Sequence, residues 1–345
     1  MTGRLVECVP NFSEGNDREV IDSILEPIVT IEGVTLLDVD MGADFNRTVV
    51  TMVGEPESVL RAAIECTTIA IDLIDMREHS GEHARMGAVD VVPFIPIRGV
   101  SMTDCVELSH RYAKSVSHAL SLPVYMYAHS SLNNQRVRLP DIRKGEYEGL
   151  RSKITTEEWT PDYGPSEFMP TMGATATGAR SILVAYNINL NTDDKGLANS
   201  IASKIRTSGA IVRDEQGNII RSDDGSPIRT PGIFEQLQAA GWMYDETTAQ
   251  VSMNLLDHSI TGLHDVTDAI HNEASKMGLE AVASELVGLV PLEAILEAGR
   301  HYHNGRNANE STLVQAAIDG LMLDRLDAFN AQSSIIEWAI AEATQ

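Results

Sequence analysis

Residues 89–96 read VDVVPFIP, and a related run, ELVGLVP, stands at residues 285–291, about 200 positions later. Each is a short apolar run next to glycine or proline, a pattern that favours a buried or edge strand. Two further pairs of segments show the same kind of echo. VECVPNFS at 6–13 resembles VAYNINL at 184–190, and VVTMVG at 49–54 resembles QVSMNLL at 250–256. The chain is therefore predicted to contain two related halves.

The echoes are not evenly spaced, and a polar insertion accounts for the difference. The first pair lies about 175 residues apart and the other two about 200. Residues 210–232, IVRDEQGNIIRSDDGSPIRTPGI, fall between them and are rich in turn-forming dipeptides. The DEQG and DDGS sequences predict a hairpin or a protruding loop.

Within each half, apolar runs alternate with helical patterns. Strands are predicted at 5–10, 34–40, 46–54, 89–97, 122–129, 180–190, 249–257 and 281–291. Helices are predicted at 11–29, 55–76, 102–121, 197–209, 262–279 and 292–303. This order predicts an α+β protein of two similar ferredoxin-like α/β lobes, each a mixed β-sheet covered by helices, that arose by internal duplication. We place the lobes at residues 1–178 and 179–345.

Residues 159–181, WTPDYGPSEFMPTMGATATGARS, are predicted to be a long connector loop belonging to the N-terminal lobe. The segment is rich in proline and glycine and has no apolar period. A loop of this length is either a linker or a functional segment. Its small residues and free backbone amides suit close approach to a flat or anionic ligand.

Composition limits the classes of function. A hydrophobic content of 43% with 22% charged residues is that of a globular protein. The net charge of −24 argues against nucleic-acid binding, which needs a basic face. Three cysteines without paired spacing, no secretory pattern at the start and no long apolar run predict a cytoplasmic protein that does not enter a membrane.

The segment HSGEH, residues 79–83, allows two interpretations. It matches the H-x-x-E-H pattern of one class of zinc peptidases, which requires both histidines on one face of a helix. Ser80 and Gly81 fall inside that turn, and glycine costs about 1 kcal/mol in a helix interior. We therefore expect no metal there. The alternative is a reactive loop histidine, His83, which can exchange a proton near neutral pH without a metal.

Polar residues near the end of the strand at 34–40 form a second candidate group. Asp38 and Asp40 alternate, so they share one face of the strand. They are either turn-forming residues or acids that line a cleft. Arg47 follows after a short loop and could bring an anion-binding group to the same edge.

Taken together, these segments resemble the formiminotransferase domain family, which includes glutamate formimidoyltransferases. The similarity rests on LVECVPNFSEG, NRTVVTMVG, PVYMYA, the segment from WTPDYGPSEF to NINL, AQVSMNLLD, and above all GEHARMGAVDVVPFIP. It extends from near the start to about residue 296. Family members usually have Pro where this chain has Ala84 and Trp where it has Met172.

The resemblance implies transfer of a formimino group between N-formimino-L-glutamate and tetrahydrofolate. Tetrahydrofolate acts as co-substrate in a tunnel between the lobes, and no metal takes part. The family's catalytic histidine falls on His83 and its acidic partner on Asp40, while we assign Arg47 to substrate carboxylates. The folate-contacting loop falls on Gly164, Pro165, Ser166, Glu167, Phe168, Met169, Pro170, Thr171, Met172 and Gly173. The resemblance also favours a homodimer.

Two other functions fit the same residues. A formyl group differs from a formimino group only by oxygen in place of nitrogen, so an N-formylglutamate or 5-formyltetrahydrofolate formyltransferase is the first alternative. A non-catalytic folate-binding protein is the second, and the presence of both His83 and Asp40 argues against it.

Overall fold

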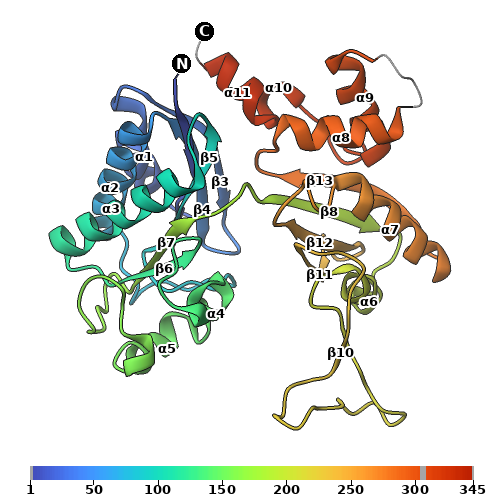
Figure 1. The fold of residues 1–345 in the computed structure, drawn as a ribbon, viewed down its shortest axis with the longest axis horizontal. Coiled ribbons are helices and arrows are strands. Elements are labelled where there is room, and N and C mark those ends of the chain that lie inside the picture. The colour runs from blue at the N-terminus through green and yellow to red at the C-terminus, as the bar shows by residue number, and fades with distance from the viewer. Residues whose placement is uncertain (1–2, 304–307, 344–345) are drawn as a thin grey trace. The chain divides into compact units, whose positions relative to one another are not determined.

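The structure is a computed structural model that describes residues 3–303 and 308–343. The chain divides into two compact units, one extending to Ser181 and the other formed by Ile182–Glu342 (Figure 1). Each unit has its own sheet and its own hydrophobic core. This arrangement confirms the predicted class of α/β protein with two lobes.

The first unit is built on a seven-stranded sheet of mixed direction. Its strands are β1 (Leu5–Cys8), β2 (Asn11–Phe12), β3 (Val34–Gly42), β4 (Arg47–Gly54), β5 (Val89–Arg98), β6 (Val124–Ala128) and β7 (Thr175–Ala179). The order along the sheet is β1-β4-β2-β5-β7-β6, and β3 pairs with β4. β7 runs parallel to β5 and β6, and the other pairs are antiparallel.

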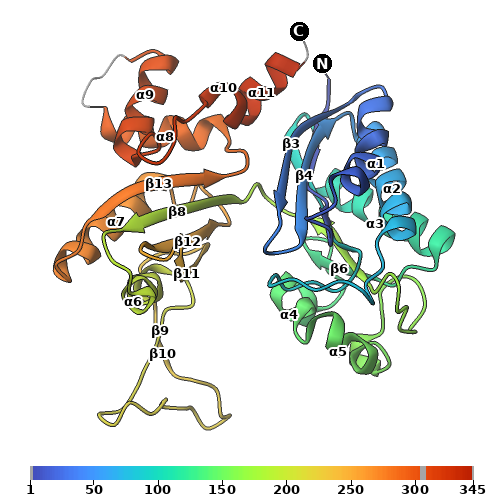
Figure 2. The ribbon, with the colours of Figure 1, turned by 180° about the vertical axis from the view of Figure 1, so that it is seen from behind.

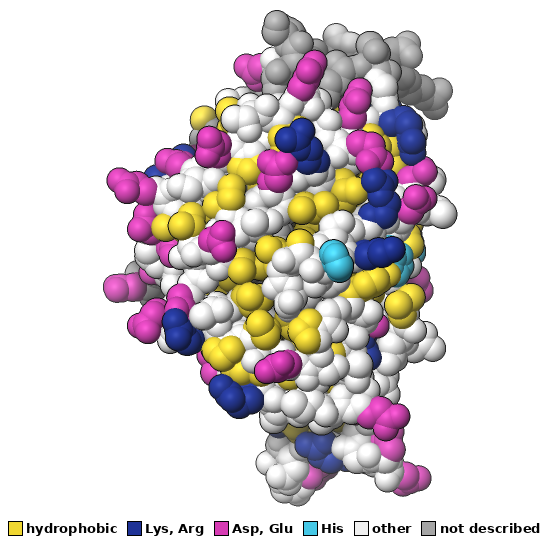
Figure 3. Space-filling view, turned by 90° about the vertical axis from the view of Figure 1, so that its left-hand side faces the viewer, with side chains coloured by type: hydrophobic (Ala, Val, Ile, Leu, Met, Phe, Trp, Pro, Cys, Tyr) yellow, Lys and Arg dark blue, Asp and Glu magenta, His cyan; other side chains and the backbone are white. Residues whose placement is uncertain are grey.

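Three amphipathic helices cover one face of this sheet (Figures 1 and 2). They are α1 (Arg18–Thr30), α2 (Pro56–Leu73) and α3 (Met102–Leu120). Asp17 caps α1 by accepting from the amides of Glu19 and Val20, and Pro56 begins α2, where its missing N–H costs nothing. The outer surface of these helices mixes acidic and basic side chains with small apolar patches (Figure 3).

The predicted connector at 159–181 is not one continuous loop, because its residues 175–179 form β7. Every residue of this strand is buried between β5 and β6. A parallel strand that is buried on both faces shows no polar alternation. Its small residues, TATGA, therefore look like loop sequence although they complete the sheet.

The opposite face of the first sheet is apolar at one end and polar at the other. At the β5-β7-β6 end, α4 (Leu139–Arg143) and α5 (Glu146–Lys153) pack on Val91, Tyr125 and Tyr127 in a smaller core. Val6 and Cys8 of β1 point into the helical core, so Glu7 between them faces the other way. This polar end of the sheet carries the candidate site.

The second unit contains a four-stranded antiparallel sheet in the order β11-β12-β8-β13. Its strands are β8 (Val184–Leu190), β11 (Leu237–Met243), β12 (Ala249–Leu255) and β13 (Ala281–Val287). The helices are α6 (Lys195–Ile205), α7 (Leu263–Lys276), α8 (Leu292–Tyr302), α9 (Glu310–Leu321), α10 (Ala331–Ser334) and α11 (Ile336–Ala343). Alternate residues of β8, such as Tyr186 and Ile188, enter the core, while Asn187 donates to Glu285 on the other face.

The insertion at 210–232 forms an arm that protrudes from the second unit (Figure 1). It begins with the short antiparallel pair β9 (Ala210–Ile211) and β10 (Arg229–Thr230). Beyond that pair, three backbone hydrogen bonds join residues within the arm: Val212 donates to Ile228, Ile228 to Ile220, and Ile220 to Val212. Residues 212–228 contribute nothing to the core of the second unit.

We expect the arm to be dispensable for folding and for binding of the folate that the family resemblance implies. Replacing residues 212–228 with Asn-Gly would close β9 and β10 as a hairpin, since Ile211 and Arg229 already pair across it. Thermal unfolding should stay cooperative and folate affinity should change by no more than a few-fold. A variant that fails to fold would show instead that the arm stabilises a lobe or a subunit interface.

Candidate active site

The His83 loop, residues 74–88, joins α2 to β5 and contains no helix. The geometry that the zinc-peptidase pattern requires is therefore absent. His79 is occupied by protein contacts: its Nε2 lies 2.9 Å from the carbonyl oxygen of Asn46, and its Nδ1 accepts from Arg85 Nε at 3.2 Å. His79 and His83 thus have different surroundings, although only three residues separate them.

Backbone contacts with the segment before β7 fix the end of the His83 loop. Ala88 donates to the carbonyl of Met172 at 3.0 Å, and Ala174 donates to Met86 at 3.2 Å. Gly173 has a φ of +68°, and a Cβ there would stand 2.1 Å from the carbonyl oxygen of Met86. Only glycine tolerates both that backbone angle and that approach. The last residues of the predicted folate loop therefore lie directly against the His83 loop.

Asn46 holds the other side of the loop. It sits in the β3–β4 turn with a φ of +46°, a conformation that asparagine tolerates better than most residues. Its side chain donates to the carbonyl of Ser80 at 2.9 Å and accepts from the amide of Gly15 at 3.0 Å. One side chain thereby connects the β3–β4 turn, the His83 loop and the segment before α1.

These segments enclose a narrow crevice in the first unit, with His83 in its wall. The other residues that line it are Phe12, Ser13, Phe45, Asn46, Arg47, His79, Arg85 and Asp90. His83 is half-buried, and its Nδ1 is buried without a hydrogen-bond partner among the described residues. The structure thus brings two of the predicted site residues, His83 and Arg47, into one crevice.

Buried charge surrounds His83. Asp90 is 2% exposed and binds the amide of Met86 at 3.0 Å through one carboxylate oxygen, while its other oxygen pairs with Arg143. Burial and the positive charges of Arg47 and Arg143 lower the pKa of His83 to about 4. At neutral pH the imidazole is therefore uncharged and able to accept a proton.

Arg47 extends from the start of β4 and donates to the side-chain oxygen of Asn11 on β2. Burial, followed by repulsion from Arg143, lowers the pKa of Arg47 to about 10, and Asp90 and Asp40 oppose that shift. Arg47 stays protonated at neutral pH. It presents a positive charge in the crevice where we predicted one.

Asp40 is exposed near the end of β3, the strand next to that of Arg47. Gly42 pairs with Arg47 across the two strands, so Asp40 is a diagonal neighbour of Arg47 on one face. Burial and the charge of Asp40 raise the pKa of Asp38, which shares this face. Asp40 is therefore an exposed neighbour of Arg47 and is not among the residues that line the crevice, whereas the buried Asp90 lines it and acts on His83.

The folate loop predicted at 164–173 packs on α5 within the first unit. Tyr147 donates to the carbonyl of Pro170 at 2.6 Å, and Phe168 contacts both the ring of Tyr147 and the guanidinium of Arg151. Gly164, Ser166, Glu167 and Pro170 are exposed. The loop is thus anchored at its aromatic residue and open at its polar ones.

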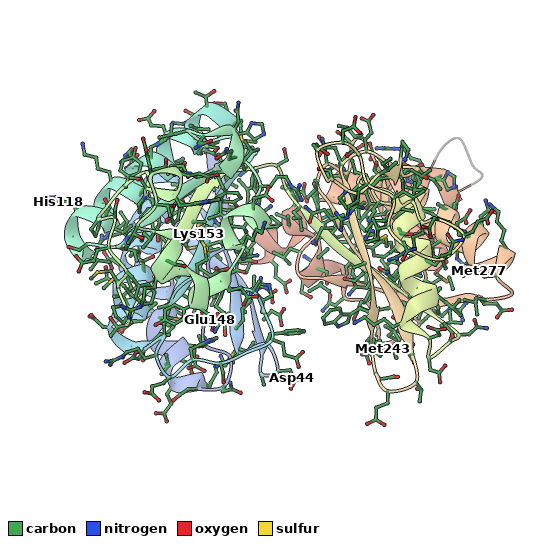
Figure 4. The ribbon with its side chains drawn as sticks, turned by 90° about the horizontal axis from the view of Figure 1, so that it is seen from below. Asp44, His118, Glu148, Lys153, Met243 and Met277 are labelled. Carbon is green, nitrogen blue, oxygen red and sulfur yellow. The ribbon has the colours of Figure 1, made fainter. Side chains whose placement is uncertain are left out.

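The structure adds three residues that the sequence interpretation did not single out. Asp90 could have been found, because a lone acid in the apolar run VDVVPFIP demands a partner when buried. Arg85 is 6% exposed and pairs with Glu146 and Glu148 of α5, where Figure 4 marks Glu148. No local sequence pattern pointed to Arg143, because only the tertiary fold brings α4 close to the crevice.

In the described residues no group of three or more His, Cys, Asp or Glu side chains is arranged to hold a metal ion. That includes the histidines His258, His264 and His301, which line a pocket of the second unit. No described helix is long and apolar enough to cross a membrane.

Comparison with known proteins finds similarity to one family over nearly the whole chain. The N-terminal subdomain of the formiminotransferase domain matches residues 5–180, and the formiminotransferase domain matches residues 185–341. A glutamate formimidoyltransferase of Streptococcus pyogenes is 39% identical over 87% of this chain and 93% of its own length. One of Thermoplasma acidophilum is 36% identical over 91% and 97%.

Longer relatives match as well. The formimidoyltransferase-cyclodeaminase of Rattus norvegicus is 45% identical over 99% of this chain, which spans 60% of that protein. The chain spans a similar share of the formimidoyltransferase-cyclodeaminases of Dictyostelium discoideum and Mus musculus. Both subdomains are thus matched in order along one chain. The chain belongs to the formiminotransferase domain family.

Proposed function

We propose that this chain is a glutamate formimidoyltransferase, which transfers the formimino group of N-formimino-L-glutamate to tetrahydrofolate and releases L-glutamate and 5-formiminotetrahydrofolate. The observation that carries the proposal is His83, an uncharged imidazole with a free buried Nδ1 in a crevice beside Arg47. The family membership and the matches to glutamate formimidoyltransferases over most of both chains support it.

The chemistry of the transfer requires a base of this kind. The attacking nitrogen of tetrahydrofolate forms a bond to the formimino carbon and must lose its proton as the tetrahedral adduct develops. His83 accepts that proton and returns one to the departing nitrogen of glutamate as the carbon–nitrogen bond breaks. His83 accepts one proton and returns one, so the transfer needs no further reactant.

Charged residues around the crevice assist in different ways. Arg47 is our candidate to hold a substrate carboxylate, because it stays protonated and has a buried Nε without a partner. The exposed Asp40 is our candidate to stabilise the positive charge of the formimino group in the adduct. Asp90 already balances Arg143 and is therefore assigned to holding the site together.

We place tetrahydrofolate against the loop Gly164–Gly173. Its polar residues Ser166 and Glu167 are exposed, and the backbone at its end is hydrogen-bonded to the His83 loop. Folate should therefore protect Glu167, which is exposed, from cleavage by a glutamate-specific protease. Glu215 in the arm is also exposed and serves as the internal control. Mass spectrometry of timed digests should show slower cleavage at Glu167 alone. Equal rates with and without folate would remove this loop from the folate site.

The direct test is a turnover assay of the purified chain with tetrahydrofolate and either N-formimino-L-glutamate or N-formyl-L-glutamate. We expect a clear preference for the formimino donor. Turnover with the formyl donor alone would assign the chain to formyl transfer. Folate binding without turnover on either donor would make it a binding protein.

This reaction has a defined place in metabolism. It would serve histidine degradation by passing a one-carbon unit to the folate pool. That the enzyme is a cytoplasmic homodimer stays a prediction from the sequence.

A further inference from the structure

Three buried polar atoms without hydrogen-bond partners belong to one cluster in the first unit. They are Nε of Arg47, Nε of Arg143 and Nδ1 of His83. Leaving a buried donor unpaired is costly, so such atoms are rare in native proteins and call for an explanation. Two of these atoms are donors on cations. The missing partner is therefore an acceptor, and an anion fits best.

The balance of charge in the cluster supports an anion. Arg85 is matched by Glu146 and Glu148. Around His83 the charges of Arg47 and Arg143 face the buried carboxylate of Asp90, while Asp40, which also acts on Arg47, is exposed. A surplus positive charge remains beside His83, although the chain as a whole carries −24. A buried surplus of this kind is costly unless a ligand of opposite charge completes it.

The chemistry of the substrate indicates which anion this is. In N-formimino-L-glutamate the formimino group is attached to the α-nitrogen, and the α-carboxylate is attached to the next carbon. If His83 exchanges a proton at that nitrogen, a carboxylate beside His83 is the α-carboxylate. We propose that Arg143, together with Arg47, binds the α-carboxylate of the glutamyl substrate. This inference rests on the proposed function and extends it to a specific group.

The proposal also has a consequence for the base. The charged groups that face His83 are Arg47 on β4, Arg143 on α4 and Asp90 on β5; Arg85 and His79 line the same crevice. A bound carboxylate would offset the positive charges that, after burial, hold the pKa of His83 near 4. The pKa of His83 should then rise, so the imidazole becomes a stronger base when the glutamyl substrate is in place.

The ligands for the test are L-glutamate, L-glutamine and L-isoglutamine. Glutamine keeps the α-carboxylate, and isoglutamine replaces it with an amide. Isothermal titration calorimetry on the whole chain should show binding of glutamate and glutamine, with isoglutamine weaker by about tenfold or more, the effect of losing a charged hydrogen bond. Glutamine weaker than isoglutamine would overturn the assignment to the α-carboxylate.

The variant for the test is Arg143→Lys, which keeps the charge opposite Asp90 but loses the planar fork of donors. Glutamate affinity should fall by about tenfold or more, with tetrahydrofolate affinity unchanged. Arg136→Lys is the matched control: Arg136 is also buried, also pairs with an acid, Asp162, and also has an unpartnered Nε. Glutamate affinity equal in Arg143→Lys and the native chain would overturn the proposal.

A measurement on the native chain covers the case in which Arg143→Lys does not fold. The NMR signal of His83 is assigned by its loss in His83→Gln, and its titration is followed with and without ligand. Glutamate should raise the apparent pKa and isoglutamine should not; no movement with glutamate overturns the proposal. Arg143-dependent glutamate binding without formimino transfer would refute the proposed function while supporting this site.

Discussion

Replacing His83 with alanine should lower kcat by about 10²- to 10⁴-fold, the usual contribution of a positioned acid–base group. That range corresponds to roughly 3 to 5 kcal/mol of activation free energy. The reason is that His83 is the uncharged imidazole in the crevice whose Nδ1 is not already bonded to protein. Tetrahydrofolate affinity should change little, because we assign the folate to the loop at 164–173. Steady-state turnover and direct folate titration on the same preparations separate the two effects.

His79→Ala is the control for that experiment. His79 has the same side chain and lies nearby in the sequence, but its two nitrogens contact Asn46 and Arg85. Its loss should loosen the loop slightly and leave kcat nearly native. Equal and severe losses in both variants, with activity restored by added zinc, would contradict the transferase mechanism and favour a metal site.

The pattern of the sequence predicted most of the strands because their burial leaves a periodic trace. The runs at 89–97 and 249–257 became β5 and β12, and the internal echoes led to two units. β7 was missed for a physical reason: both of its faces are buried, so TATGA has no alternation and its small residues resemble a turn. The pair α4 and α5 was missed because each helix is short and packs through only one or two apolar residues.

The same contrast applies to the site. His83 and Arg47 stand next to strands that the sequence locates, so their meeting in one crevice could be anticipated. Arg143 is separated from His83 by the whole of β5, α3 and β6, and only the packing of α4 brings them together. A residue contributed by tertiary structure alone leaves no local pattern. The charges around His83 therefore could not be predicted from the sequence, although His83 itself could.

Asp90 is the residue whose loss should destabilise the chain most. It is buried, it accepts the amide of Met86, and it balances Arg143. Asp90→Ala would remove the ion-pair partner of Arg143 and the buried carboxylate that also acts on Arg47. Breaking a buried ion pair in this way costs about 3–5 kcal/mol. For a unit of this size the melting temperature should fall by roughly 6–20 °C. Differential scanning calorimetry of the two-unit chain would report the loss in the transition of the first unit.

Glu57→Ala provides the comparison, because Glu57 forms an ion pair with Arg111 on the exposed surface of α2 and α3. Removing an exposed pair should cost less than about 1 kcal/mol. Asp90→Asn should fall between the two, since the amide oxygen still accepts from Met86 while the charge is lost. A native melting temperature for Asp90→Ala would mean that water reaches Arg143 freely. The crevice would then lack the buried positive charge on which both the uncharged state of His83 and the carboxylate site depend.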